Sequence, residues 1–300
     1  MANHDKKILV TGCCGLLGRE LARQLVEKGY NVTGVDNNGR FPEYVPTGFT
    51  YIQQDLSNFL IANDNNFDYI YHMAAINGTT NFYERPNVVL VNNTLGDLQL
   101  FEWAKHNPNS KIIYASSSEV VAGTDSFPTA EETNVTIEDI HNPRWSYRIP
   151  KILAENYLMN SKLNFVIIRY FNVISETSGP GHMIGDLIKK IKVGNFELQS
   201  PEETRSFCYV SDAIDATIVI AETVTEKIIN IGSDEEVCIL DAANLLAQAL
   251  GHNNVNWNLL PSKLGSVLRR KPNIDKLKEY YPTFRAKPFF QLINLIKSKL

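Results

Sequence analysis

Short apolar runs alternate with amphipathic segments along the first half of the chain. Six runs have the length of a buried strand: 7–11, 32–36, 50–54, 69–75, 111–115 and 165–171. Between them, apolar residues recur at helical spacing, as at Leu17, Leu21 and Leu25 and again over 91–106. Strands that alternate with helices predict an α/β fold, a doubly wound parallel sheet with helices on both faces.

The pattern becomes less regular after about residue 172. The remaining segments are shorter, although 228–232 has the apolar character of a strand that returns to the sheet, and 241–250 that of a helix. We therefore expect residues 1–172 to form one domain around the main sheet, joined by the strand near 228–232. Residues 173–300 are expected to form a smaller C-terminal lobe that closes over the edge of the sheet.

The first strand runs into three evenly spaced glycines, Gly12, Gly15 and Gly18, which open the first helix. In such a unit the first glycine permits the tight turn, the second lets a pyrophosphate approach the backbone, and the third allows close helix–strand packing. The second strand ends on Asp36, where the hydroxyls of an adenosine ribose would lie. This predicts a Rossmann-type dinucleotide site. Asp36 would repel a 2′-phosphate and favours NAD over NADP, whereas Arg40 nearby would suit a 2′-phosphate.

Composition and charge narrow the class of protein. Hydrophobic residues make up 44% and charged residues 21% of 300, and the net charge is −4. No basic run exceeds Arg269–Lys271, so no nucleic-acid partner is expected. No apolar segment approaches about 18 residues and the N-terminus lacks a signal peptide's apolar core, so we expect a cytoplasmic protein with no membrane partner. Four cysteines without zinc-ligand spacing, Cys13, Cys14, Cys208 and Cys238, predict neither a metal site nor a disulfide.

Two further motifs place chemistry at the carboxyl edge of the sheet, where ligands of such folds bind. Tyr147 and Lys151 are four residues apart on a predicted helix, so the ammonium group can stand near the phenol. A free tyrosine ionises at about pH 10, and an adjacent cation favours the phenolate, which makes Tyr147 a candidate general base toward a hydroxyl. Ser116, Ser117 and Ser118 end the fifth strand, where a hydroxyl could bond the same substrate oxygen.

Together these motifs resemble the extended short-chain dehydrogenase/reductases of the NAD-dependent nucleotide-sugar epimerase/dehydratase family. The similarity covers nearly the whole chain, through Thr11–Gly18, Asp36, Ser116–Val120, Tyr147-x-x-x-Lys151, Arg169–Val173, Arg205–Asp212, Ile228–Ser233 and Arg269–Asn273. The resemblance implies that the C-terminal lobe binds a nucleotide-diphosphate sugar. It also implies a homodimer joined through helices near 92–106 and 147–161, the first of which would present the apolar residues Leu95, Leu98, Leu100 and Trp103.

The resemblance also implies roles for individual residues. Ser117, Tyr147, Lys151 and Glu119 would form the catalytic group. Ser117 matches the family's Ser/Thr when Ser118–Val120 is aligned with its Ser-Glu-Val, and counting back from Gly123 selects Ser118 instead. The residues lining the NAD site would be Gly12, Gly15, Leu16, Leu17, Gly18, Asp36, Asn37, Asp55, Leu56, Met73, Ala74, Ala75, Asn93, Tyr147 and Lys151. Those binding the substrate would be Ser117, Ser118, Asn172, Arg205 and Arg270.

The family's shared first step is oxidation at C4 of the sugar, in which Tyr147 takes the hydroxyl proton while a hydride leaves for NAD. We expect a 4-epimerase-type enzyme, with a 4-dehydrogenase or a UDP-glucuronate decarboxylase-like enzyme as alternatives. The family's 4,6-dehydratases have an Asp where this chain has Ser118, a poor acid, which makes dehydration less favoured. A catalytically silent NAD-binding sensor or scaffold is an alternative of another class, but it would need the glycine turn without Ser117, Tyr147 and Lys151.

Overall fold

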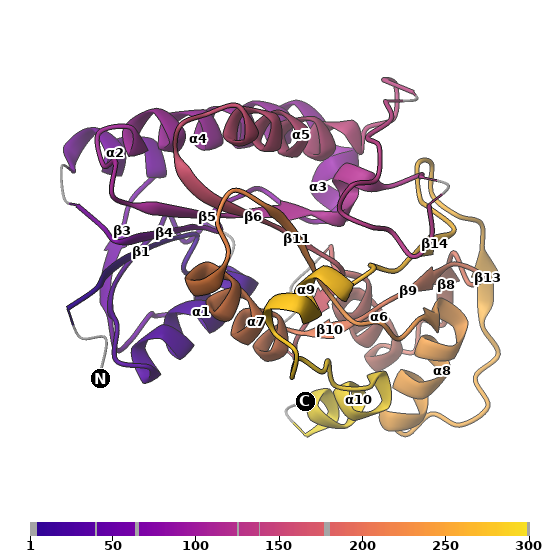
Figure 1. Ribbon diagram of the computed structural model, residues 1–300. Helices are drawn as coiled ribbons and strands as arrows, with labels where there is room; N and C mark the ends of the chain where they lie inside the picture. The colour runs from indigo at the N-terminus through magenta and orange to yellow at the C-terminus, as the bar shows by residue number, and fades with distance from the viewer. Residues whose placement is uncertain are drawn as a thin grey trace.

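A seven-stranded parallel sheet forms the centre of the molecule (Figure 1). The computed structural model describes residues 5–39, 41–63, 66–124, 126–137, 139–176 and 181–298, so Arg40 lies outside the described residues. The strand order is β11-β6-β5-β4-β1-β2-β3. The strand bounds are β1 Lys7–Thr11, β2 Asn31–Asp36, β3 Thr50–Gln53, β4 Tyr69–His72, β5 Lys111–Ser117, β6 Asn164–Tyr170 and β11 Ile228–Ile231. The predicted doubly wound α/β fold is confirmed.

Helices cover both faces of the sheet, and Figure 1 shows α2, α4 and α5 on one face and α1 and α7 on the other. Their bounds are α1 Leu16–Glu27, α2 Leu56–Ala62, α4 Pro86–Ala104, α5 Trp145–Met159 and α7 Val210–Thr223. Successive residues of a strand point to opposite faces. In β1, Ile8 and Val10 therefore join the core shared with α1 and α7, whereas Leu9 joins the core under α4 and α5. None of the described helices combines the length and hydrophobicity of a membrane span.

Besides β11, two helices from the C-terminal half of the chain pack onto the main sheet. Helix α7 precedes β11 and packs against α1, and α9 (Asp275–Tyr280) packs against β11. Both helices contribute apolar side chains to the core under α1, including Ala213, Ile214 and Leu277. This core is thus built from both halves of the chain, because α7 packs against α1 and β6, and α9 packs against β11.

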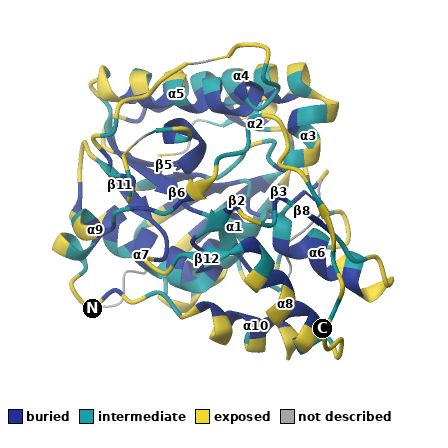
Figure 2. Ribbon diagram, turned by 90° about the vertical axis from the view of Figure 1, so that its right-hand side faces the viewer, coloured by how far each residue is buried: buried dark blue, intermediate teal, exposed yellow. Residues whose placement is uncertain are grey.

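The other C-terminal elements enclose a second core beside the sheet. Helices α6 (Met183–Lys192), α8 (Ile239–Ala249) and α10 (Phe289–Lys297) surround it. Figure 2 shows the inner faces of α8 and α10 buried and their outer faces exposed. The short strands here are β7 Val173–Ile174, β8 Glu197–Gln199, β9 Thr204–Arg205, β10 Cys208–Tyr209, β12 Val237–Cys238, β13 Asn258–Leu260 and β14 Arg269–Arg270. Strands β9 and β14 pair in parallel and place Arg205 opposite Arg270.

The order of the strands fixes where a ligand can bind. Strand β1 has β2 on one side and β4 on the other, so the chain reverses its direction of travel across the sheet at β1. Open α/β sheets bind ligands at this switch point, beyond the carboxyl ends of the strands. The residues that follow β1, β2, β4 and β5 are Gly12, Asn37, Met73 and Ser118, all of them predicted site residues.

Candidate active site

The glycine turn after β1 forms a cradle for a phosphate group. Gly12 has a φ of +70°, and a Cβ added there would lie 2.6 Å from the backbone nitrogen of Ala74. A Cβ added to Gly18 would lie 2.1 Å from the Gly12 carbonyl oxygen, whereas at Gly15 the nearest atom, the same oxygen, is 3.2 Å away. Gly15 is the N-cap of α1 and offers no capping side chain, which leaves the first N–H groups of the helix for an anion. The turn therefore fits the pyrophosphate of a dinucleotide.

Asp36 is fixed at the end of β2, beside this turn. Its carboxylate accepts hydrogen bonds from the backbone N–H groups of Cys14 (2.9 Å) and Asn38 (2.7 Å). The Asn37 side chain donates to Asp55, the N-cap residue of α2, at 3.0 Å. Three residues predicted to line the NAD site thus lie along one edge of the sheet, and their roles as ligands remain predictions.

The loop after β4 forms the wall opposite the glycine turn. Asn93, buried in α4, holds this loop by two hydrogen bonds to the backbone of Ile76: Oδ1 accepts from the N–H (2.7 Å), and Nδ2 donates to the carbonyl (3.0 Å). These bonds fix the preceding segment, Met73–Ala75, close to Gly12. The side-chain amide of Asn93 therefore shapes the predicted cofactor site from behind the loop.

Within the described ranges, one cluster brings potential metal ligands together. The ligating atoms of Cys13, Cys14 and Asp36 lie within 4.8 Å of one another. Burial raises the pKa of both thiols, and a metal is bound by the thiolate. Asp36 also already accepts the N–H of Cys14. We assign the cluster to the wall of the cofactor cradle, because both oxygens of Asp36 are already held by backbone N–H groups and burial favours the neutral form of the two thiols.

The predicted catalytic group is placed by β5 and α5, which meet at the carboxyl edge of the sheet. Strand β5 ends at Ser117, and α5 carries Tyr147 and Lys151. The Ser117 hydroxyl accepts a hydrogen bond from the Glu119 N–H at 3.2 Å. Tyr147 is 6% exposed, and its ring stacks on Phe82 with 4.9 Å between the ring centres. One helical turn later, the Lys151 Nζ lies 5.9 Å from the centre of the Tyr147 ring. The cation thus stands near the phenol, at the spacing from which a general base was predicted.

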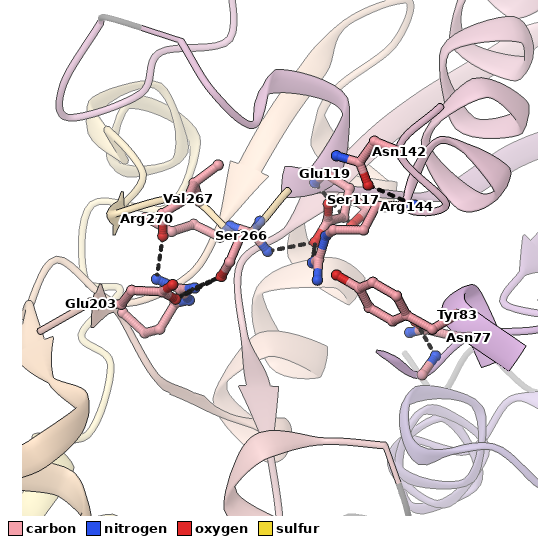
Figure 3. Close-up of polar contacts among 12 residues, drawn as sticks. Asn77, Tyr83, Ser117, Glu119, Asn142, Arg144, Glu203, Ser266, Val267 and Arg270 are labelled. Carbon is pink, nitrogen blue, oxygen red and sulfur yellow. Dashed lines mark hydrogen bonds and ion pairs between the residues drawn. The ribbon is translucent and has the colours of Figure 1, made fainter. Parts of the chain in front are cut away.

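Glu119 lies between two arginines that reach it from distant parts of the chain (Figure 3). It belongs to a 3₁₀ turn, Ser118–Val121, directly after β5. Its Oε1 accepts hydrogen bonds from Arg144, at the start of α5, and from Arg270 of β14 at 2.8 Å. Burial raises the pKa of Glu119, but the charges of Arg270 and Arg144 outweigh it and hold the pKa below its usual range. Glu119 is therefore an ionised carboxylate and a poor general acid.

Some hydrogen-bond donors of this cluster have no acceptor among the described residues. Two guanidinium groups and one carboxylate carry a net charge of +1. Arg144 Nε and Arg270 Nε and Nη2 are buried, with no hydrogen-bond partner in the described part of the chain. A cavity of about 500 Å³ adjoins them, lined by Ser118, Glu119 and both arginines but not by Ser117 or Tyr147. Buried donors in a cationic cluster fit an anionic ligand, because buried polar groups are normally satisfied.

Arg205 and Asn172, two further predicted substrate contacts, differ from each other in how their side chains are bonded. Arg205 uses Nη1 for the carbonyls of Thr204 (2.7 Å) and Val267 (3.0 Å), and Nη2 for Glu203 (2.5 Å) and Ser266 (3.2 Å). Burial, and then the charge of Arg270, lower its pKa to about 10. Arg205 thus anchors the segment before β14. Asn172 follows β6 with a φ of +40°, and its buried Nδ2 lacks a partner among the residues described. Both assignments remain predictions.

The structure adds residues that sequence reasoning missed. Arg144 stands three residues before Tyr147, and this helical spacing was the available signal. Asp97, in α4, is 1% exposed and accepts a hydrogen bond from the Tyr114 hydroxyl, which in turn accepts one from Lys151. His72, which the sequence analysis gave no role, hydrogen-bonds to Asp97 at 2.9 Å. Asp97 lies one helical turn after the predicted site residue Asn93, and this spacing was the signal for it.

Comparison with known proteins identifies the family. Residues 8–232 match the model of the NAD dependent epimerase/dehydratase family. A UDP-N-acetyl-α-D-glucosaminuronate decarboxylase from Bacillus cytotoxicus is 31% identical over 298 residues, covering 91% of each chain. A UDP-glucuronic acid 4-epimerase variant from Bacillus cereus, solved with UDP-4-deoxy-4-fluoro-glucuronic acid and NAD, is 26% identical, with a TM-score of 0.83 and coverage of 98% and 100%. UDP-glucose 4-epimerase from Thermotoga maritima has the same fold at 23% identity, with a TM-score of 0.85 and 97% of each chain covered.

The matched region contains the glycine turn, Ser117, Tyr147 and Lys151. The open face of the glycine turn and the fixed carboxylate of Asp36 fit the cofactor that the family description specifies. The family match confirms the prediction of NAD as the cofactor. The chain belongs to the NAD dependent epimerase/dehydratase family.

Proposed function

We propose that this protein oxidises C4 of a nucleotide-activated uronic acid in an NAD-dependent reaction, and that the resulting 4-keto acid loses CO2. The observation that carries the proposal is the cationic cluster with unpartnered donors, Arg144 and Arg270, beside the end of β5 and the start of α5. The 31% identical relative is named as a decarboxylase of a UDP-linked uronic acid, which supports the same substrate class.

The first step needs a base at the C4 hydroxyl. Tyr147 takes this proton, the nearby Lys151 cation stabilises the phenolate, and the Ser117 hydroxyl orients the same oxygen. NAD, when bound, supplies the acceptor for the hydride from C4. After this step the phenol is protonated and lies beside the new ketone, so it can donate a hydrogen bond to that oxygen as negative charge develops there.

The carboxylate of a uronic acid is β to this ketone. When the bond between C5 and C6 breaks, CO2 leaves and the electron pair moves toward the C4 oxygen as an enolate, which a proton delivered to C5 then converts to the 4-keto pentose. Return of the hydride to C4 and of the Tyr147 proton to its oxygen would then give the pentose product and restore the oxidised cofactor. Arg144, three residues before Tyr147, is suited to orient the sugar carboxylate, and Arg270 to hold the diphosphate. Glu119 is held ionised between them and is unsuited to protonate a departing hydroxyl, which argues against dehydration.

A second candidate is 4-epimerisation of the same uronic acid; a 4-epimerase-type enzyme, with the sugar unspecified, was the expectation from the sequence. The 26% identical UDP-glucuronic acid 4-epimerase supports it, because that protein also takes an acidic sugar. Both candidates share the proton transfer to Tyr147. They differ in whether the 4-keto acid keeps its carboxylate until C4 is reduced again.

The test is to incubate the purified protein and NAD with UDP-glucuronate, UDP-N-acetylglucosaminuronate and neutral UDP-glucose, and to follow products by NMR and released CO2. A UDP-pentose with CO2 supports decarboxylation, and an epimerised uronate supports the second candidate. Turnover of the neutral sugar alone would overturn the uronate assignment. Bound NAD with no turnover of any sugar would favour the silent NAD-binding alternative, and Tyr147→Phe is the control for background reaction.

We also infer a homodimer formed through α4 and α5, and keep the prediction of a cytoplasmic location. Val88, Val91 and Leu95 of α4 are 43%, 51% and 52% exposed at a spacing that places them on one helical face. Leu153 of α5 is 37% exposed. The face differs from the one expected, because Leu100 lies on the inner side of α4 and is fully buried, and only Leu95 of the expected set is largely exposed.

A further inference from the structure

A chain of buried polar side chains joins the catalytic lysine to the glycine turn. It runs from Lys151 through Tyr114, Asp97 and His72 to Thr11, and each of these residues is at most 1% exposed. The distances along it are 2.9 Å from Lys151 Nζ to the Tyr114 hydroxyl, 2.5 Å from that hydroxyl to Asp97 Oδ2, 2.9 Å from Asp97 Oδ1 to His72 Nε2, and 2.7 Å from His72 Nδ1 to Thr11 Oγ1. The five residues come from β1, β4, β5, α4 and α5.

The donors and acceptors of this chain match without a conflict. Lys151 donates to the Tyr114 oxygen, and the Tyr114 hydroxyl donates to Asp97. The other Asp97 oxygen accepts the Nε2–H of His72, which leaves Nδ1 as the acceptor for the Thr11 hydroxyl. A neutral imidazole satisfies both contacts. Asp97 is the one carboxylate among these five residues, and each of its oxygens accepts a hydrogen bond.

The charges of the chain cancel inside a buried region. The Lys151 Nζ lies 3.9 Å from Asp97 Oδ2, and these two groups carry opposite charges. Burial lowers the pKa of Lys151, and Asp97 followed by Glu155 opposes this effect. Glu155, on the same helix, is already bound by Arg169 through two hydrogen bonds of 2.9 and 2.6 Å. Among the described residues, the phenols of Tyr114 and Tyr147 also face Lys151.

We propose that Asp97 is a positioning residue that keeps Lys151 charged and oriented, and that His72 ties this pair to Thr11 at the entrance of the glycine turn. Lys151 is useful to Tyr147 only as a cation, since a neutral amine would not favour the phenolate. A lysine buried without a counter-ion tends to lose its proton. The link to Thr11 holds the cofactor cradle and the catalytic helix in one register, because Thr11 directly precedes Gly12. The proposal rests on the proposed roles of Tyr147 and Lys151.

The first test reads the charge of Lys151 directly and needs no substrate. Protein labelled with ¹³C at the lysine ε-carbon is titrated by NMR, and the Lys151 signal is assigned with Lys151→Met. In Asp97→Asn we expect the titration midpoint of Lys151 to fall by about 1 pH unit or more. Glu155→Gln is the matched control. It removes a different buried carboxylate, which lies on α5 and is paired with Arg169. It should lower thermal stability and shift the Lys151 midpoint downward by less than Asp97→Asn does, because Glu155 contributes less than Asp97 to keeping Lys151 charged.

The second test follows kcat against pH with the substrate found for the enzyme. As the pH is raised, kcat of Asp97→Asn should fall at a lower pH than kcat of the wild type, while the variant retains bound NAD. An unshifted Lys151 midpoint in a folded Asp97→Asn protein would overturn the proposal. If the Asn variant does not fold, Asp97→Ser, which leaves room for water, takes its place under the same criteria. A shifted midpoint without sugar turnover would reject the proposed function alone.

Discussion

Two glycines of the turn after β1 should respond differently to the same substitution. Gly18→Ala places a methyl group 2.1 Å from the Gly12 carbonyl oxygen, 2.8 Å from the Gly12 carbonyl carbon and 2.9 Å from Cys13 Cα. All three are backbone atoms, so the clash is relieved only if α1 moves away from the turn. Gly15→Ala meets one atom, the Gly12 oxygen, at 3.2 Å. The first change therefore strains the protein, whereas the second places a methyl group on the face where a pyrophosphate would approach.

The magnitudes follow from these contacts. Relieving the Gly18→Ala clash needs a shift on the order of 1 Å, and overpacking of this kind costs about 1–3 kcal/mol. The higher helix propensity of alanine offsets at most about 1 kcal/mol of this cost. A net loss near 1–2 kcal/mol corresponds to a fall in Tm of several degrees for a chain of this size. Gly15→Ala should cost less than about 1 kcal/mol in stability, since Gly15 is an N-cap without a side-chain bond.

The assay combines thermal unfolding of cofactor-free protein with titration of NAD, because bound NAD would itself raise Tm. Gly15→Ala is expected to unfold near the wild-type temperature and to bind NAD at least about tenfold more weakly, the loss that corresponds to about 1.4 kcal/mol. Gly18→Ala should lose both stability and NAD affinity. A Gly18→Ala protein as stable as the wild type would refute the close approach of α1, and wild-type NAD affinity in Gly15→Ala would refute the assigned pyrophosphate position.

Three further outcomes are expected. Tyr147→Phe should lower kcat by about 10²–10⁴-fold with NAD still bound, measured by steady-state kinetics and by cofactor release on denaturation. Glu119→Gln should destabilise the protein by about 3–5 kcal/mol at neutral pH, because Arg144 and Arg270 lose their shared partner. The folded-state pKa of Glu119 is depressed, so denaturation curves of wild type and variant should converge as pH falls below about 4.5. Leu95→Glu should produce monomers in sedimentation velocity; an unchanged dimer would exclude this face of α4.

Local patterns were sufficient to predict the sheet and the residues at its carboxyl edge. Strands such as β6, apolar on both faces, and the glycine turn are encoded within a few neighbouring residues. The arginine cluster is different, because Glu119 meets Arg144 and Arg270 from positions 25 and 151 residues away. Strands β9 and β14 have two residues each, which is too short for a hydrophobic period to be recognised. Their register, and with it the pairing of Arg205 with Arg270, depends on the folded lobe.

Helix α4 shows why hydropathy alone did not identify its exposed face. The apolar set expected at a dimer interface included Leu95 and Leu100, but Leu100 lies on the buried side of the helix with Asn93 and Asp97, and only Leu95 of this pair is exposed. This side covers the carboxyl edge of the sheet, where the polar residues hold the loop after β4 and the buried network of Lys151. Buried polar groups need partners that only the tertiary structure supplies. A polar residue at a buried helical position is therefore a better signal of the catalytic edge than the apolar residues around it.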